Sequence, residues 1–186
     1  MSARHVHLTN RHIELLFGEG ATLTHDFDLS QPGQFAAKER VILQTKKGGI
    51  EGVRVLGPAR SASQVEISKT DSFHLGLTPP IRLSGDITGS EKITLVGPIG
   101  KIELTEGVII AKSHIHMHPV DAWQFEVVDG EKVDVVVDSA RPIIFRDVVV
   151  RVHPQFQLDM HIDTDEGNAA DISQGAFGIV VKKGAS

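Results

Sequence analysis

The chain repeats one plan twice, and this internal repeat limits the possible folds more than any other feature. In the first half, two histidines one residue apart precede a helical pattern, two apolar strand patterns and a later strand with a polar residue at its centre. The same five elements return in the same order from residue 114 onward. Single short strands resemble each other by chance, but five elements in one order indicate two related halves. The matched segments are HVHLTNRHIELLFG (5–18) with HIHMHPVDAWQFEV (114–127), ERVILQT (39–45) with EKVDVVV (131–137), GVRVLGP (52–58) with DVVVRVHP (147–154), QVEIS (64–68) with DMHID (159–163), and SKTDSF (68–73) with DTDEGN (163–168).

The repeated elements predict a mainly β protein built from two small related β-barrel domains with short capping helices. Short runs rich in Val and Ile, together with 18 glycines and 8 prolines, are typical of many short strands joined by tight turns. Residues 72–111 have no counterpart in the second half, and they contain a predicted hairpin, ITLVGPIGKIELTEGVIIA (93–111). We expect one domain over residues 4–111 and another over 112–186.

The composition excludes several classes of protein. The net charge is −5 and the basic residues are scattered, which argues against nucleic acid or an anionic membrane as a partner. The chain has no cysteine, so it has no disulfide, no thiolate metal site and no thiol nucleophile. It contains no apolar run of the roughly 18 residues that a membrane span needs, and its first residues lack the apolar core of a secretory signal. We expect a soluble, cytoplasmic protein.

The histidine pairs predict two metal sites. Residues i and i+2 of a strand point to the same face, so His5 and His7 project side by side, as do His114 and His116. A single such pair is a weak signal, and the ordinary interpretation is a pair of surface or hydrogen-bonded histidines. Two pairs at matching places strengthen the metal hypothesis, and the repeat adds a third ligand to each. The candidate sets are His5, His7 and Glu66 in one half and His114, His116 and His161 in the other.

Three other segments carry weaker signals. GPARSAS (57–63) offers backbone N–H groups and Arg60 for binding phosphate, although it can also be an ordinary turn with a solvated arginine. DTDEG (163–167) lacks the ligand spacing of a calcium loop, so a capped turn is the better interpretation. The repeat aligns His118 with Thr9, and Pro119 follows it, which predicts that His118 begins a helix and is not a ligand.

Several long segments of the chain resemble the PduL-type phosphate acyltransferases, also called phosphate propanoyltransferases. The resemblance runs from about residue 3 to about residue 171. It is specific because long strings match. They are RHVHLT, SQPGQFAAKE, VRVLGPARSASQVEISKTD, LSGD, EGVIIAKSHIHM, DVVVRV and LDMHIDTDEGNAA.

The resemblance implies an enzyme that reversibly exchanges coenzyme A for phosphate on a short acyl group, so acyl-CoA and phosphate are its expected ligands. It implies two β-barrel domains, with the first few residues (1–3) paired with the C-terminal one, and two Zn²⁺ ions per chain. His5, His7 and Glu66 would hold the first zinc, whose open position can take the coenzyme A sulfur, and Arg60 would grip the phosphate. His114, His116 and His161 would hold the second zinc. Candidate contacts to coenzyme A at matching positions are Arg4, Lys47, Arg54 and Asn168.

The resemblance also implies a homodimer and a link to bacterial microcompartments and propanediol degradation. Targeted members carry an N-terminal extension that leads them to shell or cargo proteins, whereas here the metal motif begins at residue 5. A free cytoplasmic form and a chain that lost its tail both fit.

Two alternatives from other classes stay open. A zinc-dependent, thioesterase-like hydrolase would use water in place of phosphate. A non-catalytic, cupin-like metal-binding barrel would also use a His-x-His pair, although neither half has a Glu four or five residues beyond its pair, where the cupin pattern expects one.

Overall fold

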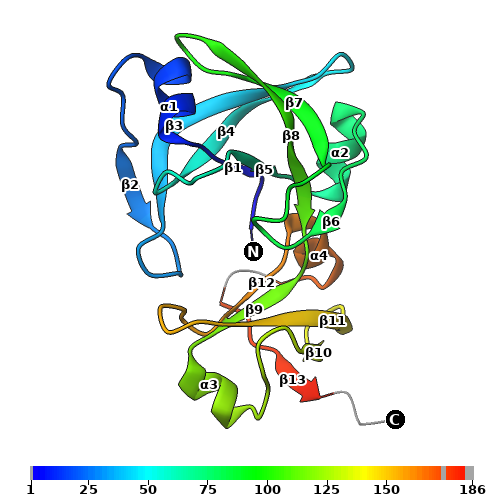
Figure 1. Ribbon diagram of the computed structural model, residues 1–186. Coiled ribbons are helices and arrows are strands. Elements are labelled where there is room, and N and C mark those ends of the chain that lie inside the picture. The colour runs from blue at the N-terminus through cyan, green and yellow to red at the C-terminus, as the bar shows by residue number, and fades with distance from the viewer. Residues whose placement is uncertain (1, 173–174, 183–186) are drawn as a thin grey trace. The chain divides into compact units, whose positions relative to one another are not determined.

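The computed structural model describes residues 2–172 and 175–182, and it confirms the mainly β class with a few short helices (Figure 1). The described chain divides into two compact units. The N unit comprises Ala3–Leu29 and Gly33–Ala111. The C unit comprises Ser2, Ser30–Pro32 and the described residues from Lys112 onward. Within residues 2–172 and 175–182, no helix is long and apolar enough to cross a membrane.

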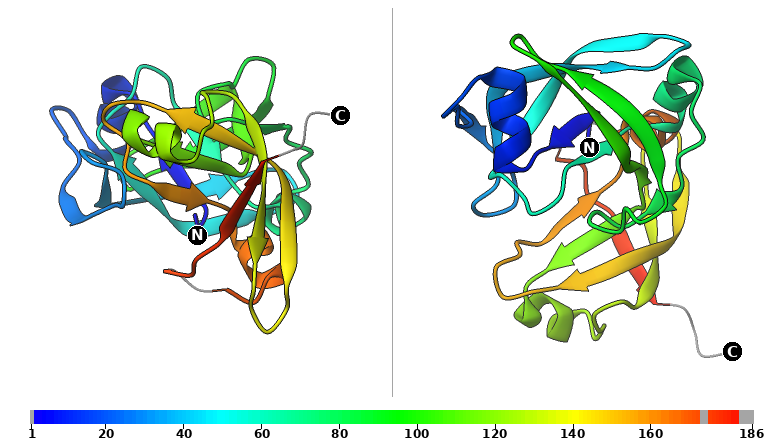
Figure 2. Two further views of the ribbon diagram at one scale, coloured as in Figure 1. Left: turned by 90° about the horizontal axis from the view of Figure 1, so that it is seen from below. Right: turned by 45° about the horizontal axis from the view of Figure 1, so that its top comes forward.

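Six strands of the N unit close into a barrel (Figure 2). Pairing runs from β3 to β4, β1, β5, β8 and β7, and β7 pairs with β3 again to complete the circuit. Strands β2 and β6 extend the sheet beside β3 and β8. The strands are β1 (His5–His7), β2 (His25–Asp28), β3 (Phe35–Gln44), β4 (Gly49–Gly57), β5 (Gln64–Glu66), β6 (Ile81–Arg82), β7 (Glu91–Val96) and β8 (Lys101–Ala111).

Apolar side chains from these strands fill the barrel. Val6, Leu43 and Leu95 have no exposed surface. Helix α1 (Asn10–Phe17) adds Ile13 and Leu16 to the same core. The predicted hairpin is confirmed, because β7 and β8 pair antiparallel. A short second helix, α2 (Lys69–Leu75), follows β5.

The C unit contains a five-stranded sheet in the order β12-β9-β11-β10-β13, with β12 and β13 at its two ends among the described strands. Its own apolar core includes Ile115, Met117 and Val150. The strands are β9 (His114–Met117), β10 (Lys132–Val137), β11 (Ile143–Val152), β12 (Asp159–His161) and β13 (Ile179–Lys182), and the helices are α3 (Pro119–Gln124) and α4 (Thr164–Ala169).

Strand pairing confirms the repeat. In the N unit, β1 lies parallel to β4 and antiparallel to β5. In the C unit, β9 lies parallel to β11 and antiparallel to β12. Each pair of histidines therefore sits on a short strand between two others, and the third candidate ligand comes from the antiparallel neighbour.

The helix starts follow the predicted local chemistry. Thr9 caps α1 and His118 caps α3, with Pro119 as the first residue of that helix, so His118 is a helix-start residue as predicted. Asp163 caps α4 in a capping box with Glu166, so the cap predicted at DTDEG is present but begins a short helix and not a turn.

Candidate metal centres

The first cluster consists of His5 and His7 on β1 and Glu66 on β5. The register places His5 directly opposite Glu66, and the ligand atoms of all three residues lie within 4.8 Å of one another. All three side chains are buried. Nε2 of His5 is 3.4 Å from Oε2 of Glu66. Two ligands held at about 2.0–2.1 Å in tetrahedral geometry are about 3.4 Å apart, so this spacing fits a zinc ion.

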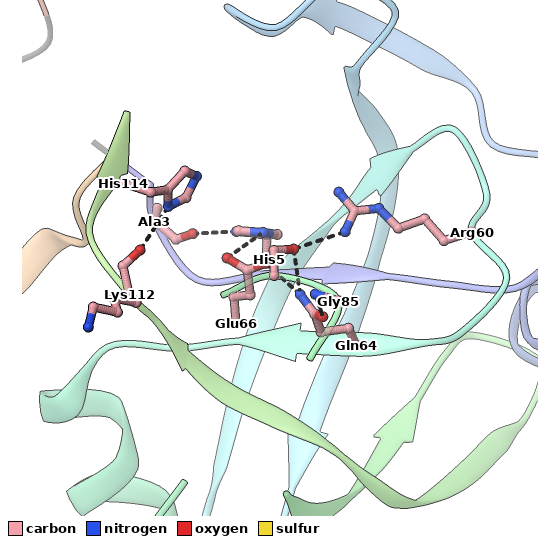
Figure 3. A network of polar contacts seen from close by, with 9 residues as sticks. Ala3, His5, Arg60, Gln64, Glu66, Gly85, Lys112 and His114 are labelled. Atoms are coloured by element: carbon pink, nitrogen blue, oxygen red, sulfur yellow. Dashed lines mark hydrogen bonds and ion pairs between the residues drawn. The ribbon is translucent and has the colours of Figure 1, made fainter. Parts of the chain in front are cut away.

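The backbone fixes the ring of His5. Its Nδ1 lies 2.8 Å from the carbonyl oxygen of Ala3, and because a carbonyl only accepts, Nδ1 donates to it and Nε2 is the ring nitrogen that faces Glu66 (Figure 3). Nδ1 of His7 is buried and has no hydrogen-bond partner among the described residues. A buried imidazole nitrogen without a partner is costly, and a metal ion would satisfy it.

A polar network surrounds Glu66 (Figure 3). The Gln64 amide donates to Oε1 of Glu66 at 2.5 Å and to the Ser84 hydroxyl at 2.9 Å, and it accepts from the backbone N–H of Gly85 at 2.7 Å. Nη1 of Arg60 donates to the same Ser84 hydroxyl at 3.0 Å. The structure thus brings Arg60 to the first cluster, as its place in the sequence suggests.

Sequence reasoning missed Gln64 and Ser84. Gln64 was detectable, because it lies two residues before Glu66 on one strand and so shares its face. Ser84 lies in the part of the chain without a repeat counterpart, and nothing in the sequence connects it to β5.

Charge and burial set the protonation states of the first cluster. Burial and the neighbouring charges of His5 and Arg60 lower the pKa of His7 well below its usual value. Burial opposes the ionisation of Glu66, but the charge and hydrogen bond of His5 outweigh it and lower the pKa of Glu66. For His5, burial is likewise outweighed by Glu66 and by the Ala3 carbonyl, which raise the pKa of the imidazole. A carboxylate and a neutral His7 are the forms that bind metal.

The second cluster consists of His114 and His116 on β9 and His161 on β12. His161 lies directly opposite His114, and the ligand atoms are within 4.8 Å of one another. Nδ1 of His114 lies 2.8 Å from the carbonyl oxygen of Lys112, two residues earlier, as Nδ1 of His5 does with Ala3 (Figure 3). The backbone therefore fixes the tautomer in both clusters.

His116 occupies the position that His7 has in the first cluster. Its Nδ1 is also buried without a hydrogen-bond partner among the described residues. Burial, together with the charges of His161, His114 and Arg151, lowers the pKa of His116 to about 3. The imidazole is therefore neutral near pH 7, which is the metal-binding form.

Asp159 adds a carboxylate beside the second cluster, which the sequence hypothesis did not include. Its Oδ2 is 3.4 Å from Nε2 of His161, and its side chain is 40% exposed. Asp159 pairs with His116 in the strand register, as Gln64 pairs with His7. The two clusters thus differ at this position, with an amide in one and a carboxylate in the other.

The four candidate contacts to coenzyme A lie in different surroundings. Arg4 binds the buried Asp71 through two nitrogens, at 2.7 and 2.9 Å. Nζ of Lys47 donates to the Phe73 carbonyl at 2.9 Å. Nη1 of Arg54 donates to Oδ2 of Asp26 at 2.6 Å. Asn168 is an exposed residue of α4.

Comparison with known proteins identifies the family. The family model described as phosphate propanoyltransferase matches residues 1–173. The chain belongs to the phosphate propanoyltransferase family. A relative of that name from Thermotoga maritima is 52% identical over 183 residues, which cover 98% of this chain and 87% of the relative. One from Priestia megaterium is 57% identical over 180 residues, covering 97% and 83%, and one from Clostridioides difficile is 50% identical over 182 residues, covering 98% and 87%.

The match to the phosphate propanoyltransferase family includes all six candidate ligands and Arg60, since these residues lie between positions 5 and 161. Both clusters contain a histidine with a lowered pKa, His7 in one and His116 in the other, whose buried Nδ1 has no hydrogen-bond partner among the described residues. This donor chemistry fits zinc.

Proposed function

We propose that the protein transfers a short acyl group between coenzyme A and inorganic phosphate, giving acyl phosphate and free coenzyme A in a reversible reaction. Family membership supports this proposal, and the phosphate propanoyltransferase names of relatives at about 50% identity point to the same chemistry. The observation that carries it is the pair of clusters, His5, His7 and Glu66 in one and His114, His116 and His161 in the other, the first with Arg60 bound to the adjoining polar network.

Two Zn²⁺ ions per chain are part of this proposal. His5, His7 and Glu66 would hold one and His114, His116 and His161 the other. When bound, zinc supplies Lewis-acid charge that stabilises developing negative charge on oxygen and sulfur. Glu66 reduces the net charge of the first site, whereas three neutral histidines leave the full charge of the ion at the second and favour an anionic ligand there.

The chain's own residues supply binding and orientation. The planar guanidinium of Arg60 can donate two hydrogen bonds to one phosphate group. It would hold the phosphate so that a phosphate oxygen attacks the thioester carbon. The carbon–sulfur bond then breaks, and coenzyme A leaves as the thiolate while the acyl phosphate forms. Because the chain has no cysteine, no acyl-cysteine intermediate precedes this attack.

Coenzyme A carries phosphate groups that need cationic or N–H partners. Arg4, Lys47, Arg54 and Asn168 are the residues proposed to bind them, and all four are at least partly exposed. A cytoplasmic or microcompartment location and a homodimer belong to the same proposal. Each stays a prediction.

The decisive assay measures release of coenzyme A from acetyl- and propanoyl-CoA as a function of phosphate concentration, before and after removal of metal by a chelator. We expect turnover that requires phosphate, disappears on chelation and returns with zinc. Release that is indifferent to phosphate would indicate the thioesterase-like hydrolase. Metal binding without any turnover would indicate the cupin-like barrel.

A further inference from the structure

The residue before each histidine pair is bonded to the helix that follows the third ligand. In the N unit, Arg4 precedes His5, and its guanidinium binds the carboxylate of Asp71 with Nε–Oδ2 at 2.9 Å and Nη2–Oδ1 at 2.7 Å. Asp71 is the third residue of α2. It also accepts from the backbone N–H of Ser68, the cap of that helix, and its side chain is 6% exposed.

The C unit contains the equivalent contact with different residues. Ser113 precedes His114, and its hydroxyl donates to Oε1 of Glu166 at 2.5 Å. Glu166 is the third residue of α4, and its Oε2 accepts from the backbone N–H of Asp163, the cap of that helix, at 2.9 Å.

The two contacts occupy matching places in the repeat. Ser68 and Asp163 each lie two residues beyond the third ligand of their cluster, Glu66 or His161. Asp71 and Glu166 each lie five residues beyond it. An ion pair in one half and a hydroxyl–carboxylate hydrogen bond in the other thus make the same connection, although the two contacts share no residue type and have only a carboxylate group in common.

We propose that these two contacts, the N bridge (Arg4–Asp71) and the C bridge (Ser113–Glu166), position the ligands of the two metal centres by fixing the strand that carries each histidine pair against the strand that carries the third ligand. The inference rests on the proposed zinc centres. Asp71, Ser113 and Glu166 are positioning residues, since they act through the ligands. Arg4, which is also proposed to contact coenzyme A, has the same positioning role through its ion pair with Asp71.

The strands that carry the ligands are short, so few backbone hydrogen bonds fix their register. Strands β1, β5 and β12 have three residues each and β9 has four, and the two ligand-bearing strands of each centre pair over three residues. A slip by one residue would turn a ligand to the other face of the sheet. Each bridge joins the residue before the first histidine to a helix carboxylate five residues past the third ligand, and this carboxylate also accepts from the N–H of the helix cap. The bridge therefore holds both strands where their ligand side chains meet.

The test measures zinc affinity one centre at a time, by competition with a chelator of known affinity. His116→Ala leaves only the first centre and His7→Ala leaves only the second. Arg4→Ala is expected to weaken zinc binding about 10-fold or more in the His116→Ala background and to leave it unchanged in the His7→Ala background, because lost outer contacts typically cost 10- to 100-fold in metal affinity. Ser113→Ala is expected to show the reverse pattern.

Conservative variants separate positioning from general damage. Glu166→Gln can still accept from the Asp163 N–H and donate to the Ser113 hydroxyl, so it is expected to keep near-parental affinity, whereas Glu166→Ala is not. Arg146→Ala is a matched control, because this arginine makes an ion pair with Asp134 at 3.6 Å while its side chain is 75% exposed. We expect no change in zinc affinity in either background.

Two outcomes would overturn the proposal, and they are distinguishable. If both backgrounds bind zinc and the bridge variants bind it equally well, the bridges do not position the ligands and the metal centres stand. If neither background binds zinc, the metal centres themselves fail, and this role of the bridges fails with them.

Discussion

At the residue scale, the two histidines of each pair are held in different ways. The ring of the first is oriented by a backbone carbonyl two residues earlier, at 2.8 Å in both units. The second has a buried Nδ1 without a hydrogen-bond partner among the described residues. The first histidine therefore keeps its orientation in the metal-free protein, while the second gains most from a bound ion.

Replacing Arg60 by Ala is expected to raise the KM for phosphate more than it changes the KM for acyl-CoA. A hydrogen bond to a charged group contributes about 1.5–3 kcal/mol, which corresponds to roughly 10- to 150-fold in affinity. Steady-state kinetics with phosphate as the varied substrate would measure this. Arg40→Ala is the control, because Arg40 is exposed on β3 and donates to the Gly52 carbonyl. An unchanged phosphate dependence in Arg60→Ala would remove Arg60 from its proposed role.

At the element scale, the turn between β7 and β8 packs against the end of α1. The backbone N–H of Ile99 donates to the Leu16 carbonyl at 3.1 Å. A Cβ built at Gly97 would lie 2.5 Å from that carbonyl oxygen. The turn thus satisfies a carbonyl that the helix end leaves open, and glycine is needed for the close approach.

Gly97→Ala is expected to lower the free energy of unfolding by about 1–3 kcal/mol, the usual cost of forcing an extra methyl group into a packed contact. Denaturant unfolding followed by circular dichroism would measure it. Gly48→Ala is the comparison, because a Cβ there meets its nearest atom, the His74 carbonyl oxygen, at 3.4 Å, which is ordinary contact. Equal stability of the two variants would contradict the steric argument.

At the scale of the whole molecule, the lowered pKa values of His7 and His116 make the metal-free protein sensitive to acid. The folded state lowers the pKa of His116 from 6.5 to about 3, chiefly by burial, so the unfolded chain binds more protons in this interval. The free energy of unfolding should then fall as the pH is lowered from about 6.5 toward 3.

His116→Gln is expected to flatten this pH dependence. It removes a group that must stay neutral in the folded state but takes up a proton on unfolding. The measurement is urea unfolding of the chelated protein at a series of pH values from 7 to 4 for both chains. Parallel curves for the parent and the variant would show that His116 does not contribute.

The sequence by itself determined the mainly β class, the repeat and the two sets of candidate ligands, because strand alternation and the order of matched segments can be read directly from the residues. It also placed the helix start at His118, where cap chemistry depends on a few neighbouring residues.

Only the tertiary structure decided what surrounds those ligands. The N bridge joins residues 67 positions apart and the C bridge residues 53 apart. Ser84 reaches Arg60 and Gln64 from a segment that the repeat does not contain. Such contacts depend on the register in which distant strands pair, and a one-residue change in register would abolish them while leaving every local pattern of the sequence intact.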